Sequence, residues 1–207
     1  MEGTVSASPP GPAASTRPGG RSARVRAEVL AAVRDELTAH GYDGLSVEAV
    51  ARRSGVHRAT VHRRWKDVGG LLADTVMEAR DDGWRPPDTG NLTDDLIVLN
   101  REVHAAFTEE PSISAALVAA SFRSPPAADA LGAFWADRYA RCLPIVERAV
   151  ARSEVPPGTD AMRLLIAATA PVYQHLILLR DSPTVQHVDR YAHDAAEAGR
   201  AGIYARS

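Results

Sequence analysis

The chain has 207 residues, of which 45% are hydrophobic, 24% are charged and 5% are aromatic, and its formal net charge is −2. A chain of this length can bury a sizeable core, either as one domain or as a small domain fused to a larger one. Because no apolar run approaches the roughly 20 residues of a transmembrane helix and no secretory signal is recognisable, we expect a cytoplasmic protein that does not bind membranes.

The first 20 residues differ in composition from the remainder of the chain. They are rich in proline, glycine and serine and have almost nothing to bury, which predicts a disordered tail over 1–20. Beyond the tail the hydrophobic pattern is helical and no strand pattern appears. Apolar residues recur at every fourth position from Val25 to Leu37, which predicts an amphipathic helix over 22–39 that ends at Gly41.

Two short helices are predicted next. Ser46 is a suitable N-cap for a helix over 47–53, because its hydroxyl can accept a hydrogen bond from the first helical turn. Gly55 breaks this helix after two turns, and a third helix spans about 57–65. A helix, a tight glycine turn and a second helix within twenty residues indicate a helix-turn-helix.

Positive charge is concentrated around these helices. Residues 21–66 carry ten Arg and Lys against five acidic residues, whereas 67–207 carry thirteen against twenty. This asymmetry suggests that the N-terminal third meets a polyanion, although a basic face that is merely solvated remains the alternative. On a helical wheel Val61 and Trp65 point inward, and the polar and basic side chains point outward.

An outward basic helix of this width fits the major groove of B-form DNA. Arginine forks match guanine edges or phosphates, threonine can meet a thymine methyl group, and the preceding helix can direct its amino end at a phosphate. The arginines at the start of the first helix either contact phosphates or are ordinary solvated side chains. The candidate DNA contacts are Arg24, Ser46, His57, Arg58, Thr60, His62, Arg63, Arg64 and Lys66.

The middle of the chain reads as further helices separated by strong breakers. A fourth helix is predicted over 68–83, and the run WRPPDTGN at 84–91 is the best candidate boundary between two layers. Apolar stripes then predict a helix from Leu92 to Phe107, a shorter helix after Pro111 and a long helix over about 127–153.

The last two predicted helices have unusual compositions. The stretch 164–179 is apolar on nearly every side, so it has to be covered on two faces. We infer that these helices pack on their own core and on the same pair of a second subunit, through about 160–204, as a two-fold four-helix bundle. The alternative is a wholly internal hydrophobic helix. The final helix, over 184–204, carries small residues that allow close helix approach: Ala192, Ala195, Ala196, Gly199 and Gly202.

The helix-turn-helix segment also carries a family resemblance. The sequence LSVEAVARRSGVHRATVHRRW at 45–65, followed by the leucine pair at 71 and 72, resembles the helix-turn-helix of the tetracycline-repressor-like (TetR/AcrR) transcriptional regulators. Three positions depart from the family pattern. His57 stands where a serine or threonine usually caps the recognition helix, and His62 where a tyrosine usually contacts phosphate. Val68 replaces a common lysine, for which Lys66 is a substitute two positions away.

The resemblance implies an all-α homodimer with an N-terminal three-helix DNA-binding domain over 21–66 and a C-terminal helical bundle over 67–207. It implies a sequence-specific transcriptional regulator, a repressor that leaves a palindromic operator when a small-molecule effector binds in the C-terminal domain. The residues of suitable type for that cavity are Asn100, Arg101, His104, Phe107, Phe122, Phe134, Trp135, Tyr139, Tyr173, Gln174 and His175. For each aromatic residue, plain core packing is the alternative.

The sequence offers little support for other functions. There is no G-x-S-x-G elbow, no phosphate-binding glycine loop and no H-E-x-x-H, so we do not expect an enzyme. The single cysteine, Cys142, has no Cys or His at metal-ligand spacing, and neither a metal nor a cofactor is expected. The alternative function is a helical carrier or interaction protein whose DNA-binding module is vestigial or non-specific.

Overall fold

The structure is a computed structural model that describes residues 19–79 and 83–205. All the secondary-structure elements in these two ranges are helices, which confirms the predicted all-α class. The predicted tail lies outside the described residues, except for Gly19 and Gly20, which begin the first helix. The elements are α1 (Gly19–Gly44), α2 (Val47–Ser54), α3 (Arg58–Trp65), α4 (Val68–Ala79), α5 (Leu92–Thr108), α6 (Ile113–Ser121), α7 (Pro125–Ala151), α8 (Ala161–Tyr173), the π-helical segment η1 (Gln174–Leu179) and α9 (Val185–Arg200).

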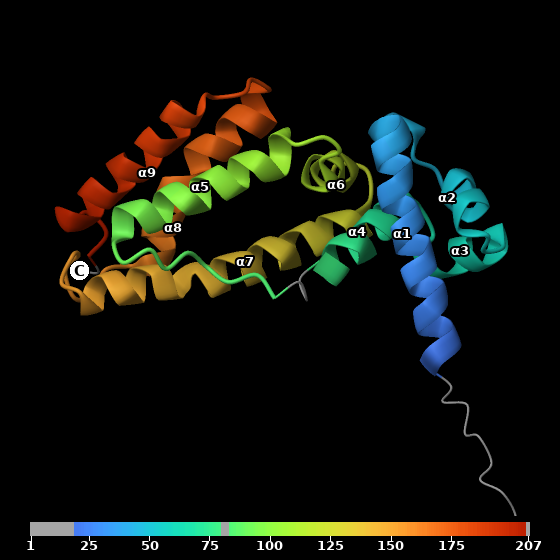
Figure 1. Cartoon of the computed structure of the whole chain (residues 1–207), viewed down its shortest axis with the longest axis horizontal. Coiled ribbons are helices and arrows are strands. Elements are labelled where there is room, and N and C mark those ends of the chain that lie inside the picture. Colours follow the sequence, from blue (N-terminus) through green and yellow to red (C-terminus); the bar gives the residue numbers. More distant parts are fainter. Residues whose placement is uncertain (1–18, 80–82, 206–207) are drawn as a thin grey trace, which may run out of the picture.

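The molecule is elongated, with α1, α2 and α3 at one end and α5, α7, α8 and α9 towards the other (Figure 1). Helices α4 and α6 lie between these groups. Helix α4 packs against α1 and α3 on one side and against α6 and α7 on the other. It is therefore a physical link between the two ends of the molecule.

Local sequence signals define the first three helices as predicted. Gly41 has a non-helical backbone with φ 64°, which kinks α1 near its end. The hydroxyl of Ser46 accepts a hydrogen bond from the backbone N–H of Ala49 at 3.1 Å, so Ser46 is the N-cap of α2. Gly55 ends α2 with φ 68°, in the left-handed region that glycine adopts without strain.

The first hydrophobic core joins the helix-turn-helix to its neighbours. Val50 and Val61 are fully buried in it, together with Leu71 and Leu72 of α4. The same core continues into α6 and the start of α7, where Leu117 is buried. Since α4 belongs to the same apolar core as α2, α3 and α6, a movement of α4 has to repack this core.

The second core fills the space between α5, α7, α8 and α9. Its fully buried members include Leu96 of α5, Ile145 of α7, and Leu164 and Leu165 of α8. Most of the small residues of the last helix, which were predicted to allow close approach of another helix, allow it within the subunit. Four are buried within the subunit: Ala192, Ala195, Ala196 and Gly199. They bring α9 close to α5 and α8, and a Cβ atom at Gly199 would lie 2.8 Å from Leu164 Cδ1.

The expectation that no apolar segment is long enough to span a membrane was also wrong. Residues Ala161–Leu179 form one helical stretch of 19 residues with mean hydropathy 1.4, long and apolar enough by those two criteria. One side of it, with Leu164 and Leu165, belongs to the second core. The other side is exposed at Met162 and Ile166, so an apolar face of α8 remains uncovered in the single chain.

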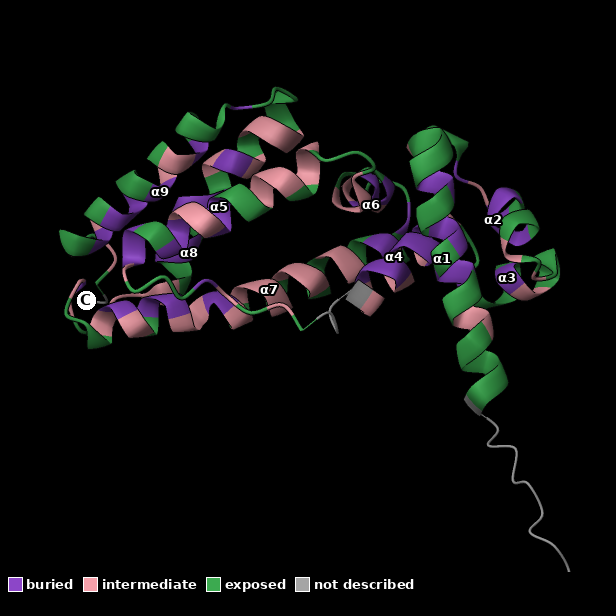
Figure 2. Ribbon diagram, in the orientation of Figure 1, coloured by how far each residue is buried: buried purple, intermediate pink, exposed green. Residues whose placement is uncertain are grey.

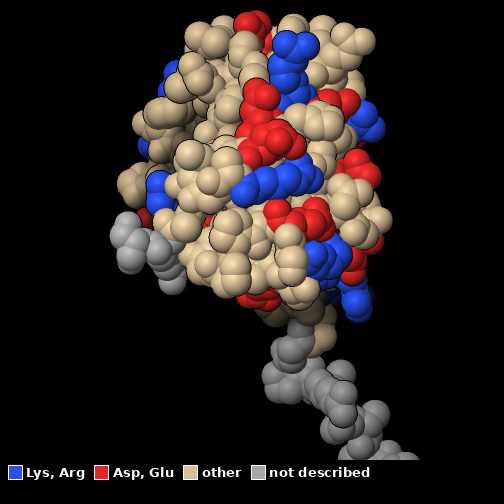
Figure 3. All heavy atoms as spheres, turned by 90° about the vertical axis from the view of Figure 1, so that its left-hand side faces the viewer, with Lys and Arg blue, Asp and Glu red and all other residues tan. Residues whose placement is uncertain are grey.

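The end of the molecule that is farthest from α2 and α3 carries interleaved charges. Figure 3 shows acidic and basic side chains alternating over this end. Arg152 bonds to Glu154, and Arg200 bonds to Glu197 and lies near Glu154. Fully buried Asp95 accepts hydrogen bonds from the backbone N–H and the hydroxyl of Thr89. Charge here is balanced locally, in contrast to the arginine-rich surface of the helix-turn-helix.

Candidate functional site

Helix α3 has one buried and one exposed side, as the wheel predicted. Val61 is 0% and Trp65 5% exposed, and both lie in the first core. Figure 2 shows the opposite side of α2 and α3 as exposed surface at the end of the molecule. The predicted DNA-facing residues on and around α3 are exposed except Thr60, which is half-buried: His57, Arg58, His62, Arg63, Arg64 and Lys66. The exposed cationic side of α3 is thus held in place by the buried side chains of Val61 and Trp65.

His57 caps the recognition helix in place of the serine or threonine usual at this position. Its Nδ1 atom accepts a hydrogen bond from the backbone N–H of Ala59 at 3.3 Å. A neutral imidazole that accepts at Nδ1 carries its proton at Nε2. The cap therefore leaves an N–H donor on the far side of the exposed ring, where it is free to meet a partner.

An acidic residue that the sequence analysis did not select lies on the same surface. Glu48, in the first turn of α2, forms an ion pair with Arg58 at the start of α3. A backbone hydrogen bond lowers the pKa of the Glu48 carboxyl, desolvation opposes it, and Arg58 and His62 lower the pKa further. Glu48 is therefore ionised at neutral pH and forms an exposed ion pair between α2 and α3 across the glycine turn.

Three arginines near this surface make contacts within the protein. Arg64 donates to the backbone oxygen of Ser22 at 3.2 Å and its guanidinium lies 4.9 Å from the ring centroid of Trp65. Arg24 lies 3.5 Å from Glu28 on its own helix. Arg26 binds Asp74 through both carboxylate oxygens. Arg64 therefore packs α3 against α1.

By contrast, the side chains of His62, Arg63 and Lys66 have no hydrogen-bond or ion-pair partner within 19–79 and 83–205. All three side chains are exposed, and Arg63 lies in the last turn of α3. Their charged or polar ends are available to an external ligand without the loss of an internal bond.

A polar cluster fixes the far end of α3. The indole Nε1 of Trp65 donates to Asp74 of α4 at 2.8 Å, and Arg26 of α1 donates to the same carboxylate at 2.8 Å. Burial by itself raises the pKa of Asp74, but the hydrogen bonds from Arg26 and Trp65 outweigh it and the pKa is lowered. Asp74 thus remains ionised and joins three helices at one point.

The turn between α3 and α4 is packed tightly against α7. Asp67 accepts a hydrogen bond from the backbone N–H of Gly70 at 2.8 Å and lies 3.4 Å from the hydroxyl of Ser124. A Cβ atom at Gly69 would lie 2.2 Å from the same hydroxyl oxygen. Only glycine allows this approach of α4 to the start of α7, which couples the position of the reading helices to the rest of the chain.

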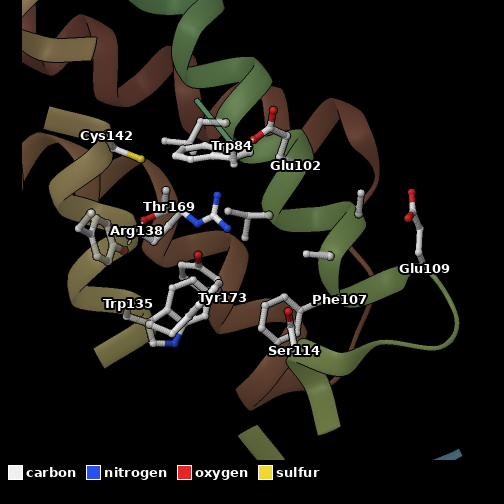
Figure 4. Close-up of a pocket in the computed structure, with 16 residues that line it drawn as sticks. Trp84, Glu102, Phe107, Glu109, Ser114, Trp135, Arg138, Cys142, Thr169 and Tyr173 are labelled. Carbon is white, nitrogen blue, oxygen red and sulfur yellow. Dashed lines mark hydrogen bonds between the residues drawn. The ribbon is translucent and has the colours of Figure 1, made fainter. Parts of the chain in front are cut away.

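A cavity of ≈ 360 Å³ lies between α5, α7 and α8 (Figure 4). Five of the residues predicted for a ligand site line it: Phe107, Phe134, Trp135, Tyr139 and Tyr173. Phe107, Trp135 and Tyr173 contact one another, with ring centroids 5.0 Å apart for Trp135 and Tyr173. The hydroxyl groups of Tyr139 and Thr169 share a hydrogen bond of 2.8 Å.

Comparison with known proteins accounts for both regions. Residues 29–75 match the family model for bacterial regulatory proteins of the tetR family, and 86–195, more than half of the chain, match that of the tetracyclin repressor-like C-terminal domain. The chain belongs to the TetR family. As a member of this family, the protein is a DNA-binding transcriptional regulator, and α2 and α3 are its helix-turn-helix.

Individual relatives of this TetR-family regulator extend over most of its length. The HTH-type transcriptional regulator AqdR of Rhodococcus erythropolis is 32% identical over 168 residues, which are 79% of this chain and 80% of AqdR. The HTH-type transcriptional regulator Rv1556 of Mycobacterium tuberculosis is 35% identical over 129 residues, 62% of this chain and 64% of its own. The solved structure of the TetR family regulator SCO0332 superposes with a TM-score of 0.68 at 27% identity, over 84% of this chain and 97% of that one.

Some residues predicted for the ligand site of the TetR regulator lie elsewhere. Asn100 is fully buried and its amide donates to the backbone oxygens of Ala168 and Val188, at 2.9 and 3.2 Å, so it ties α5 to α8 and α9. The Nε2 atom of His104 lies 3.0 Å from the backbone oxygen of Pro183. Both side chains face α9 or the loop before it, on the side of α5 that does not line the cavity.

Phe122 and His175 are likewise outside the cavity. Phe122 follows α6 and is 79% exposed, because the chain turns there before α7 begins. His175 lies between Asp181, 2.7 Å from Nδ1, and the hydroxyl of Tyr191, 2.9 Å from Nε2. These positions depend on how α6 and η1 are oriented, which the hydrophobic pattern does not specify. Arg101 and Gln174 are also absent from the lining.

The cavity contains residues that the sequence analysis did not select. Trp84, from the predicted breaker, and Arg138, one turn after Trp135 on α7, both line it, as do Glu102 and Thr169. The available signals were weak: a tryptophan inside a proline-rich loop, and an arginine on an otherwise apolar helix face. Their meeting depends on the path of the loop over α7, which no local pattern encodes.

The thiol and the two phenol groups that line the cavity are neutral at neutral pH. Burial raises the pKa of the Cys142 thiol to about 11 and also raises the pKa of the Tyr139 and Tyr173 hydroxyls. Arg138 partly opposes the shifts at Cys142 and Tyr173, so its charge lies close to both groups. Within the described ranges, no cluster of three or more His, Cys, Asp or Glu side chains is arranged to hold a metal ion.

Proposed function

We propose that this TetR-family protein is a repressor that binds an operator with dyad symmetry and leaves it when a small molecule occupies the cavity. The observation that supports this most is the coexistence of an exposed cationic helix on a buried Val61–Trp65 base with an aromatic cavity in the same chain. We assign 21–66 to DNA binding and 67–207 to ligand binding and dimerisation. The two family models, which match 29–75 and 86–195, support this division.

We assign the contacts with DNA first to exposed side chains that have no partner within the described part of the protein. Arg63, His62 and Lys66 are exposed and unpaired within the described chain, which suits them to base edges or phosphates. Arg58 enters the groove as a pair with Glu48, and the carboxylate sets the direction of its guanidinium. The remaining candidates, Arg24, Ser46, His57 and Thr60, serve phosphates or the neighbouring bases, and Arg64 supports α3 from the side.

Replacing Arg63 by alanine is expected to weaken operator binding by about 1–3 kcal/mol without unfolding the protein. The operator is first obtained by selecting bound fragments from random DNA with the purified protein. If Arg63 contacts a base, its loss relaxes the sequence preference at one position of each half-site. If Arg63 contacts a phosphate, its loss weakens binding to all sequences alike. It also reduces the slope of log K against log salt concentration by about one.

The control for this prediction is Arg123→Ala, which removes the same charge from an exposed position after α6. It should leave operator affinity within error of the unchanged protein. If Arg63→Ala binds as tightly as the control, Arg63 is not in the interface. If the unchanged protein selects no sequence at all and its binding disappears steeply with salt, the alternative of a carrier with a non-specific DNA-binding module is favoured.

Release by a ligand requires a mechanical connection. In our proposal the ligand changes the position of α7, and the tight contact of Ser124 with Asp67 and Gly69 passes the change to α4 and the reading helix. A compound acts in this way only if it binds one spacing of the two reading helices better than the other.

We further propose that two copies associate through the exposed apolar side of α8 and η1. Ile166 is 44% and Leu178 75% exposed, and Met162 and Leu179 add to the same apolar stretch. Exposed apolar residues in this number favour burial against a second surface. A two-fold pairing also buries the exposed apolar side of the segment Ala161–Leu179 against a second subunit instead of against a membrane. It gives the dimer two α3 helices, one for each half-site of the operator.

The paired substitution Ile166→Glu and Leu178→Glu is expected to convert a dimer into a monomer in light scattering and to abolish cooperative operator binding. The physical reason is that two carboxylates per subunit would have to be desolvated against their symmetry mates. Phe122→Glu is the matched control, because it also replaces an exposed large apolar side chain but lies outside α8 and η1. A double variant that remains a dimer contradicts this assignment of the interface.

A further inference from the structure

Arg138 occupies an unusual position in the cavity. Its guanidinium lies 4.0 Å from the ring centroid of Trp84 and 5.2 Å from that of Phe134. Figure 4 shows it below the Trp84 ring, extending between Trp84 and Tyr173. The side chain is only half exposed, and within the described ranges it has no hydrogen-bond acceptor and no ion-pair partner.

The geometry of a stacked guanidinium leaves its donors available. Its five N–H groups all lie in the plane of the group, so contact of its faces with aromatic rings does not use them. The planar fork matches the two oxygens of a carboxylate, and such charge-assisted pairs are shorter and stronger than neutral hydrogen bonds. Trp84 and Phe134 thus hold a cationic fork in the cavity in an orientation that suits an anion.

Other charges around the cavity do not neutralise this fork. Glu102 is exposed and accepts a hydrogen bond from Trp84 Nε1 at 2.9 Å, which holds the indole ring over Arg138. Glu109 lies at the end of α5, on the side of the cavity away from Arg138 in Figure 4. Cys142 is a neutral thiol at neutral pH because burial raises its pKa to about 11. Both carboxylates of the lining, Glu102 and Glu109, are exposed, and neither forms an ion pair with Arg138.

The remainder of the cavity favours flat apolar groups. Phe107, Trp135 and Tyr173 come from three helices and contact each other in stacked and edge-to-face arrangements. Aromatic pairs prefer these arrangements, and a further planar ring can extend them without desolvating a polar group. The polar groups at the wall opposite α5, Tyr139 and Thr169, already bond to each other.

We propose that the effector is a planar aromatic carboxylic acid, with its carboxylate on Arg138 and its rings against Phe107, Trp135 and Tyr173. The proposal rests on the proposed function, since it assigns a chemical class to the small molecule that releases the repressor. It makes Arg138 a specificity-determining residue, with Trp84 as the group that positions it.

The test compares three probes of one shape: 2-naphthoate, its neutral amide 2-naphthamide, and the cation 2-naphthylmethylammonium. Binding to the full chain is measured by calorimetry and by quenching of tryptophan fluorescence, with benzoate and biphenyl-4-carboxylate as a shorter and a longer acid. At least one of the acids is expected to bind. The naphthoate should bind about 10- to 100-fold more tightly than the amide, the range typical of a hydrogen bond to a charged group.

The variant Arg138→Gln should remove the advantage of the acid over the amide and leave amide binding nearly unchanged. Unchanged amide binding shows that the cavity is intact, so a loss confined to the acid reports the guanidinium itself. Arg123→Gln, which removes a positive charge from an exposed site outside the cavity, should keep the full advantage of the acid.

Four results would each overturn the assignment: equal binding of acid and amide to the unchanged protein, tightest binding of the ammonium probe, an acid preference that survives in Arg138→Gln, or no binding of any acid at millimolar concentration. Operator binding of the ligand-free protein is measured separately by gel shift. A protein that binds its operator but fails these ligand tests refutes the aromatic acid and not the repressor. A protein without operator binding refutes the proposed function, whatever the probes do.

Discussion

Trp65→Ala is expected to destabilise the protein by about 3–5 kcal/mol and to abolish operator binding. Trp65 is 5% exposed and fills the first core beneath the recognition helix. Alanine removes the ring and leaves a cavity at this position, and it also removes the indole hydrogen bond to Asp74. Denaturant unfolding followed by circular dichroism measures the first effect, and gel shift measures the second.

The variant Trp65→Phe separates packing from hydrogen bonding. It keeps most of the apolar volume and loses only the Nε1 donor, so the expected cost is about 1–3 kcal/mol, with weaker but measurable operator binding. Asp74 retains its bonds to Arg26 in this variant. If Trp65→Ala bound the operator as tightly as the unchanged protein, the buried base of α3 would not be needed to hold the reading face.

Gly70→Ala is the second substitution with a large expected effect. A Cβ atom at Gly70 would lie 2.1 Å from the backbone oxygen of Trp65, and no side-chain rotation can relieve a contact with the main chain. Inserting a methyl group into such a site typically costs about 1–3 kcal/mol. The gain in helix propensity from glycine to alanine is at most about 1 kcal/mol, so we expect net destabilisation and at least tenfold weaker operator binding.

The matched control for Gly70→Ala is Gly132→Ala. Gly132 also lies in a helix, but a Cβ atom there meets nothing within 4 Å. The same substitution should therefore raise stability by up to about 1 kcal/mol and leave operator binding unchanged. Thermal unfolding and gel shift of the two variants side by side measure the contrast. Equal behaviour of both variants would mean that the turn between α3 and α4 tolerates displacement.

The helix-turn-helix could be predicted almost completely from the sequence because its signals are local. Ser46 caps α2, Gly55 supplies the left-handed residue of the turn, and the spacing of Val61 and Trp65 defines the buried side of α3. Each of these depends on residues within about one helical turn. The predicted exposure of the basic side chains followed from the same spacing.

The partners of those basic side chains were not predictable in the same way. Arg58 meets Glu48 and Arg64 meets Ser22 across gaps of ten and forty-two positions in the chain. A helical wheel shows that both arginines point outward, but it contains no information on what another helix brings beside them. The distinction between Arg63, which is free, and Arg64, which supports α3, needed the coordinates.

The sequence by itself determined that this protein is helical, that residues near 46–65 form a DNA-reading unit, and that the chain belongs with the TetR regulators. Hydrophobic period, caps and glycines act over a few residues, so they can be read directly. Only the tertiary structure decided that the small residues of α9 face inward and that Trp84 lies over Arg138, 54 positions away. Such contacts depend on how whole helices pack, and packing is a property of all their surfaces together.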